Sequence, residues 1–267
     1  MNRSIFLLSI LSISLLTGCE TLQNTWSGTK TFYRSYLNTP ATIDYEETGS
    51  LEDVEKLMVL QTRDIFTQLS ELERKMENMD RGPTPESLEA LTRAFPWLDG
   101  VVMIDKDGAI LAQEPADPMK QLDYSPLLQQ KNERLDNRAL RTLVQDTPLG
   151  PEIMLGVPVF RDAELAGIFI VHFDPRALVR MVPDPGKLII RSPELILWTG
   201  RYAIDSTPMA GDDWKKEATK NISGHADNKT GTFYWLAKIF GNEPLIFAVP
   251  EKGTFPENTT ALDGLTN

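Results

Sequence analysis

The sequence predicts an α+β fold in which a long N-terminal helix precedes two antiparallel-sheet modules. Two observations support this prediction. Apolar residues recur with helical spacing over residues 51–79, and the order strand, strand, helix-bearing insert, strand, strand occurs twice. Antiparallel strands covered by a helix form an α+β layer. The chain has 267 residues, of which 41% are hydrophobic, so it is long enough for two small packed modules.

The chain begins with an export signal. Arg3 precedes Ile5–Leu16, a run that contains only Ile, Phe, Leu and Ser. The run is shorter than the roughly 20 apolar residues that a transmembrane helix needs, and it has the length of a signal-peptide core. It ends in Leu16-Thr17-Gly18-Cys19.

These last residues resemble the lipobox of bacterial lipoproteins, in which an aliphatic and two small residues precede the modified cysteine. The resemblance implies a signal peptide over residues 1–18, cleavage before Cys19, and acylation of the Cys19 thiol and of the new amino terminus. Several acyl chains anchor a protein stably in a membrane. Glu20, where inner-membrane lipoproteins of enterobacteria carry aspartate, favours the outer membrane, facing the periplasm. The alternative is an ordinary secretory signal with a chance cysteine.

Composition excludes several classes of function. The 27 Lys and Arg against 38 Asp and Glu give a net charge of -11, which argues against a nucleic-acid partner. The single cysteine excludes an intrachain disulfide and a cysteine zinc site, and His172 and His225 are the only histidines. The sequence contains no G-x-S-x-G, P-loop, G-x-G-x-x-G or H-E-x-x-H motif. We therefore expect no catalytic residues, no metal, no cofactor and no enzyme activity.

Residues 19–49 are predicted to be a tether and residues 50–96 a helical segment. The aromatic residues of the tether either rest at the lipid headgroups or pack on the folded domain. Ser50-Leu51-Glu52-Asp53 has the features of a helix start, and apolar residues follow at spacings of three and four up to Met79. Gly82-Pro83 ends this helix, and a second helix is expected over 85–95. The 51–79 helix either packs on its own sheet or forms a homodimer.

Residues 97–183 are predicted to form the first module and residues 184–252 the second, smaller one. Turn signals separate apolar runs of strand length in both. Trp198, Trp214 and Trp235 are expected in the core, and residues 253–267 are expected to be a disordered tail. The predicted elements are strands 101–105, 109–113, 153–160, 165–173, 187–191, 195–199, 232–239 and 245–249, with helices over Asn132–Gln145 and Asp212–Lys220.

Several of these segments resemble an extracytoplasmic Cache domain, the PAS-like sensor module of bacterial receptors. The resemblance covers about residues 50–250. It implies two PAS-like modules, an unknown small-molecule ligand, and signalling through a membrane receptor or another envelope protein, since the chain carries no second long apolar run and no kinase or cyclase segment. The segments that carry the resemblance are Gly100–Leu111, Gly156–Phe160, Ala166–Val171, Phe233–Leu236 and Pro244–Pro250.

In such a module the ligand would lie between the sheet and the insert. Tyr124 could supply a hydroxyl, and Arg141, on the expected 132–145 helix, could pair with a carboxylate or be a solvated charge. His172 is either a ligand contact or a hydrogen-bonded core residue, and Asp174 follows two residues later. The amino-acid-binding subgroup has Asp where His172 stands and a Trp-Tyr pair that is absent here, so we expect no amino-acid ligand.

The sequence thus favours a lipid-anchored extracytoplasmic sensor that binds a small molecule. The alternative is an envelope adaptor or assembly lipoprotein that uses the same scaffold without a ligand.

Overall fold

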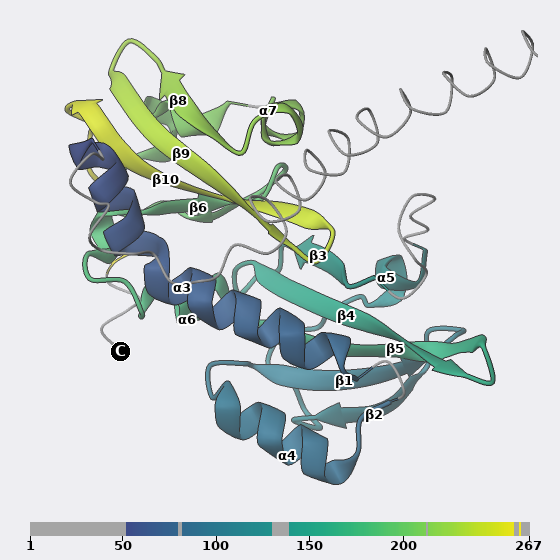
Figure 1. Ribbon diagram of the computed structural model, residues 1–267. Helices are drawn as coiled ribbons and strands as arrows, with labels where there is room; N and C mark the ends of the chain where they lie inside the picture. The colour runs from purple at the N-terminus through teal and green to yellow at the C-terminus, as the bar shows by residue number, and fades with distance from the viewer. Residues whose placement is uncertain (1–51, 80–81, 130–138, 212, 259–261, 263–267) are drawn as a thin grey trace, which may run out of the picture. The chain divides into compact units, whose positions relative to one another are not determined.

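The computed structural model describes residues 52–79, 82–129, 139–211, 213–258 and 262 (Figure 1). The lipobox, Cys19 and the tether lie outside these residues, so the predictions made for them stay predictions. Among the helices of the described part, none combines the length and apolar character needed to cross a membrane.

The long helix α3 spans Asp53–Glu77. Its N-cap is Glu52, two residues after Ser50, and Glu52 exchanges capping-box hydrogen bonds with Glu55. Its apolar stripe is buried in the chain's own core, and acidic residues in the first turn and basic residues in the last complement the helix dipole. Helix α4, Pro85–Ala94, follows with a second capping box at its N-cap Thr84.

The first module is a five-stranded antiparallel sheet in the order β2-β1-β5-β4-β3. A short helix, α5 (Ser125–Gln129), lies in the insert between β2 and β3, and α6 (Pro175–Val179) follows β5. The strands are β1 (Gly100–Asp105), β2 (Ile110–Glu114), β3 (Arg141–Gln145), β4 (Glu152–Arg161) and β5 (Glu164–Phe173).

The second module repeats this arrangement, with the order β7-β6-β10-β9-β8. Helix α7 (Trp214–Lys220) lies in its insert. Its strands are β6 (Ile189–Arg191), β7 (Ile196–Trp198), β8 (Ser223–Asp227), β9 (Gly231–Phe240) and β10 (Glu243–Gly253), and single-turn 3-10 helices occur at Pro185–Lys187, Ile204–Ser206 and Pro208–Ala210. The identical strand order confirms two similar modules.

Strand alternation divides each sheet into two faces. Ile153, Leu155 and Val157 of β4 join α3 and residues of β10 in one continuous core. The opposite face of the first sheet, here called the insert face, carries a separate apolar cluster that includes Met154, and a third cluster lies on the insert side of the second sheet. The three tryptophans predicted to be core are buried.

Three sequence predictions were wrong in detail. Residues 141–145, expected to end a helix, form β3, and β8 was not predicted. Both are edge strands of the described sheets: β3 pairs with β4 and β8 with β9. Residues 254–258, expected in a disordered tail, are anchored, because Phe255 packs on Tyr202 and Phe233.

Candidate functional site

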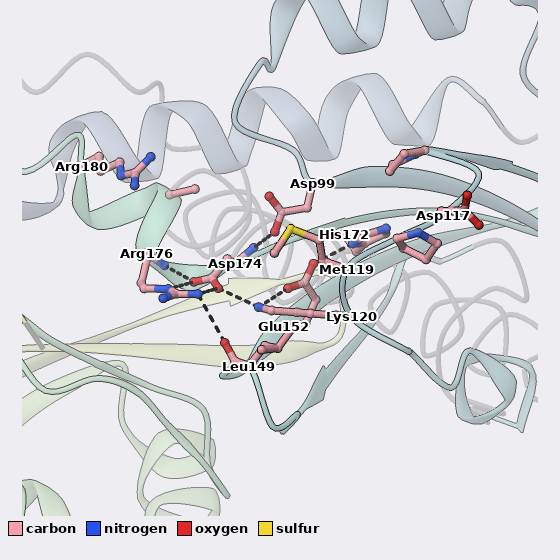
Figure 2. Close-up of a pocket in the computed structure, with 13 residues that line it drawn as sticks. Asp99, Asp117, Met119, Lys120, Leu149, Glu152, His172, Asp174, Arg176 and Arg180 are labelled. Atoms are coloured by element: carbon pink, nitrogen blue, oxygen red, sulfur yellow. Dashed lines mark hydrogen bonds and ion pairs between the residues drawn. The ribbon is translucent and has the colours of Figure 1, made fainter. Parts of the chain in front are cut away.

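A cavity of about 570 Å³ opens at the end of the insert face of the first sheet (Figure 2). The start of β4 and the end of β5 form its floor. Residues 115–120, which follow β2 and are here called the strap, form one wall. The lining residues are Asp99, Pro115, Asp117, Pro118, Met119, Lys120, Leu149, Glu152, His172, Asp174, Arg176, Ala177 and Arg180.

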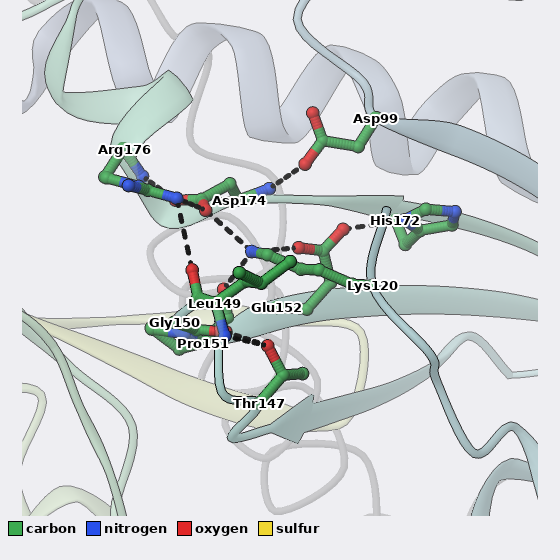
Figure 3. A network of polar contacts seen from close by, with 10 residues as sticks. All are labelled: Asp99, Lys120, Thr147, Leu149, Gly150, Pro151, Glu152, His172, Asp174 and Arg176. Carbon is green, nitrogen blue, oxygen red and sulfur yellow. Dashed lines mark hydrogen bonds and ion pairs between the residues drawn. The ribbon is translucent and has the colours of Figure 1, made fainter. Parts of the chain in front are cut away.

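The buried ammonium group of Lys120, a strap residue, reaches the floor of the cavity and binds its oxygens (Figure 3). Lys120 Nζ donates to Asp174 Oδ2 at 2.6 Å, to Glu152 Oε2 at 2.7 Å and to the Pro151 carbonyl at 2.9 Å. The Lys120 side chain is 10% exposed and that of Glu152 is fully buried. All three ammonium protons therefore have an oxygen acceptor.

Asp174 connects this ammonium group to helix α6. As the N-cap it accepts a hydrogen bond from the Arg176 backbone at 2.8 Å, and the Arg176 guanidinium contacts both carboxylate oxygens at 2.9 and 2.5 Å. The Asp174 backbone in turn donates to Asp99 Oδ2 at 2.9 Å. The local sequence Asp174-Pro175 explains the position, because proline favours the first turn of a helix and aspartate its N-cap.

His172 completes the floor. Its Nδ1 is hydrogen-bonded to Glu152 Oε1 at 2.6 Å. The ring is 3% exposed, and Nε2 has no hydrogen-bond partner among the described residues. Gly100 lies opposite His172 in the β1–β5 ladder, and a Cβ there would lie 2.5 Å from Nε2. Glycine at this position leaves room for the imidazole.

Lys120 and Asp174 stabilise each other's charged form, whereas the charged form of Asp99 is disfavoured. Burial acts to lower the pKa of Lys120, but hydrogen bonds to Asp174 and Glu152 outweigh it, and the pKa is raised. Burial acts to raise the pKa of Asp174, but hydrogen bonds from Arg176 and Lys120 outweigh it, and the pKa is lowered. Burial, followed by the charge of Glu152, raises the pKa of Asp99.

The rim of the cavity is exposed and partly apolar. Met119 is 89% exposed and Leu149 is 50% exposed, an arrangement that leaves two large apolar side chains in water beside a charged floor. Single exposed apolar residues are common, but here both lie at the mouth of one cavity.

The structure brings together two of the four residues predicted from the sequence. His172 and Asp174 both line the cavity. Tyr124 is buried in the apolar cluster of the insert face, where burial raises its pKa to about 12. Arg141 lies on β3 rather than on a helix, is 9% exposed, and donates to the Leu127 carbonyl at 2.7 Å.

Where the α5 part of the insert covers the sheet, the space in which a ligand was expected is occupied by the chain's own side chains. The residues that fill it are Val102, Ile104, Tyr124, Leu127, Met154, Ile168 and Ile170. The cavity lies beside this cluster, between the end of the sheet and the strap, which is the first part of the insert.

Sequence reasoning missed Lys120, Glu152 and Asp99. Only Glu152 has a signal in the sequence: it directly precedes the apolar run of β4, so period-two alternation places it on the face of Met154. Nothing in the strap sequence distinguishes Lys120 from a surface lysine. Within the described ranges, no group of His, Cys, Asp and Glu has the arrangement of a metal site.

Comparisons with known proteins identify relatives by structure alone. No family model matches the chain, and no curated protein matches it. An extracellular ligand binding receptor from Desulfohalobium retbaense aligns with a TM-score of 0.54 at 13% identity, over 74% of this chain and 40% of that one. The chain thus spans less than half the length of that receptor.

Two further structures align less closely. The ligand-binding domain of the Pseudomonas aeruginosa amino-acid chemoreceptor PctC, in complex with GABA, gives a TM-score of 0.47 at 11% identity, over 74% of this chain and 95% of that one. The sensory domain of the Campylobacter jejuni chemoreceptor Tlp3, with isoleucine bound, gives 0.43 at 15% identity, over 79% and 98%. At such identities a similarity establishes only a fold, and of these three only the first exceeds a TM-score of 0.5. The chain therefore has a Cache-like α+β fold: a long N-terminal helix followed by two PAS-like antiparallel-sheet modules.

Proposed function

We propose that this protein is a lipid-anchored, extracytoplasmic sensor that binds a small molecule in the first module and presents the bound state to a membrane partner. The observation that carries the proposal is the cavity of about 570 Å³, on whose floor charged groups from the strap, β4, β5 and α6 converge. Ligand sites are typically concave and largely preformed, with a few convergent polar groups.

The lipobox supports attachment through Cys19, and Glu20 favours the outer membrane over the inner. A partner protein in the envelope would receive the signal. The apolar stripe of α3 is buried in the core, so a homodimer through this helix would have to use its opposite face, where Leu60 is 55% exposed.

A binding screen tests the sensing proposal. The complete chain is titrated with a metabolite panel by thermal shift, and each positive compound is then measured by calorimetry. We expect at least one ligand that raises the melting temperature, because a compound that binds only the folded state stabilises it. The Glu152→Gln variant should weaken that binding, whereas Glu164→Gln, at the exposed first residue of β5, should not.

An envelope adaptor without a ligand is the second candidate. The apolar cluster of the insert face supports it, because the space between α5 and the sheet is closed by apolar side chains. A screen in which a correctly folded chain binds no compound would favour the adaptor and would contradict the sensor.

A further inference from the structure

We propose that Lys120 is an internal ligand in an ammonium-binding site, and that the external ligand of this cavity is a protonated primary amine that competes with Lys120. The inference rests on the proposed function and names the chemical class that the cavity would take.

Three oxygen acceptors surround Lys120 Nζ. Glu152, Asp174 and the Pro151 carbonyl supply three oxygens from β4, from the end of β5 and from the connection between β3 and β4, at 2.6 to 2.9 Å. One oxygen for each N–H proton is the arrangement that a primary ammonium needs. A quaternary ammonium has no N–H to donate, and a planar guanidinium cannot place three N–H groups on one nitrogen.

The three oxygens can be reached from the cavity. Glu152, Asp174 and Lys120 all line the open cavity, and the lysine reaches the site from the strap rather than from the sheet. The strap residue before it, Met119, is 89% exposed. An ammonium entering from the cavity would therefore meet the same three oxygens once the Lys120 side chain withdraws with the strap.

The charged groups around the site favour a cationic ligand. All three donors of Lys120 are used, and Arg176 is bound to Asp174 through Nε and Nη2. The third cation of the lining, Arg180, is exposed, and the three cations face four carboxylates, those of Asp99, Asp117, Glu152 and Asp174. Asp99 has no ion-pair partner in the part of the chain that the structure describes, and one of its carboxylate oxygens accepts no hydrogen bond there. His172 Nε2 is likewise without a partner. These remaining groups favour a ligand that is cationic and donates hydrogen bonds.

An external amine has to compete with the Lys120 ammonium. A tethered ammonium has a high effective concentration, of the order of millimolar or more, so a bare amine cannot displace it. The external amine must carry a body that fills the cavity and contacts Met119 and Leu149. Its binding would release the strap, which is a change of state that a partner protein can read.

Chemical rescue tests the site. Lys120→Ala removes the ammonium but keeps Cβ, so n-propylammonium replaces the atoms that are lost. In the complete Lys120→Ala chain, n-propylammonium chloride at about five times its Kd should raise the melting temperature by about 2–4 °C. The control salt is tetramethylammonium chloride, which carries the same charge without N–H. The control variant is Lys106→Ala, which removes an exposed lysine from the β1–β2 turn.

We expect rescue of Lys120→Ala by n-propylammonium alone, no shift in the wild type or Lys106→Ala, and loss of rescue in Lys120→Ala/Glu152→Gln. If Lys120→Ala is unfolded in buffer, rescue is read as recovery of its circular dichroism signal. Absence of rescue, or an equal effect of tetramethylammonium, would overturn the inference.

The two proposals fail separately. A wild-type ligand without an ammonium group, together with no rescue, would contradict the amine inference and leave the sensor standing. Rescue without any metabolite that binds the wild type would support the ammonium site and contradict the sensor.

Discussion

Lys120 Nζ lies 2.6 Å from Asp174 Oδ2, although the two residues are 54 positions apart in the sequence. This ion pair fastens the strap to the end of β5, and Glu152 adds a second carboxylate at 2.7 Å. The group is buried, so its members depend on one another more than surface charges do.

Loss of Lys120 should destabilise the fold. Lys120→Met keeps most of the side-chain length but leaves the buried Glu152 and Asp174 without their shared cation, which typically costs about 3–5 kcal/mol. Urea unfolding monitored by circular dichroism measures the change. Lys106→Met, where the ion pair is exposed, should change the free energy of unfolding by less than about 1 kcal/mol. Equal effects of the two substitutions would contradict the role of Lys120.

Stability should decrease in acid through Asp174. Because the folded-state pKa of Asp174 is lowered, its contribution is present above the unfolded value of 3.8 and is lost as pH falls through the folded pKa. Melting temperatures of the wild type and Asp174→Asn should therefore differ at neutral pH and converge in strong acid.

Asp99 should have the opposite effect on the pH dependence of stability. Its folded-state pKa is raised, so the folded state gains stability relative to the unfolded state as pH falls through that pKa toward 3.8. Asp99→Asn should remove this gain and should be at least as stable as the wild type at neutral pH. An Asp99→Asn variant with the same acid dependence as Asp174→Asn would show that this assignment of signs is wrong.

Gly100 should not tolerate a side chain. An alanine Cβ would lie 2.5 Å from His172 Nε2 and 2.7 Å from the Glu114 carbonyl, so Gly100→Ala should cost about 1–3 kcal/mol of stability. Gly211→Ala is the control, because its Cβ would meet only the Pro208 carbonyl at 3.7 Å and its φ is −60°. Chemical denaturation compares the two variants, and a neutral Gly100→Ala would contradict the packing of His172.

Thr142 should hold the two modules together. Its buried hydroxyl donates to the Phe240 carbonyl at 2.6 Å, at the tip of the β9–β10 hairpin. Thr142→Val keeps the shape but removes this donor from a buried carbonyl, at a cost of about 1–3 kcal/mol. Thr219→Val, on the exposed face of α7, should cost less than about 1 kcal/mol by the same urea titration. An unchanged unfolding midpoint for Thr142→Val would remove this residue from the junction.

Ala163 should be improved by glycine. Asp162 and Ala163 have φ values of 53° and 67°, which form the type I′ turn that joins β4 to β5. Alanine is strained in this region, so Ala163→Gly should stabilise the protein by up to about 1 kcal/mol. Gly108→Ala, at φ 90°, should do the reverse. Calorimetric melting temperatures of both variants check the pair.

Local patterns explain why part of the fold could be predicted. The period of α3 and the turns at Lys106-Asp107-Gly108 and Arg161–Glu164 are short-range features, and the structure has them where they were expected. The edge strand β8 escaped prediction because Ser223–Asp227 has no apolar alternation and is held by backbone pairing with β9. Strand β3 was not predicted because its buried Thr142 is held by hydrogen bonds to Phe240 and Asn242, about a hundred residues away.

By itself the sequence determined the lipobox that predicts the anchor, the helix and strand patterns that predict two sheet modules, and the acidity that argues against nucleic acid. Only the tertiary structure decided where a site could lie. Lys120, Glu152 and Asp174 converge because an irregular strap crosses the end of a sheet, and no periodicity in the sequence records where such a segment lies. The tertiary structure also placed Tyr124 in the apolar cluster and His172 in the lining of the cavity. Long-range packing, rather than local propensity, decided where these side chains lie.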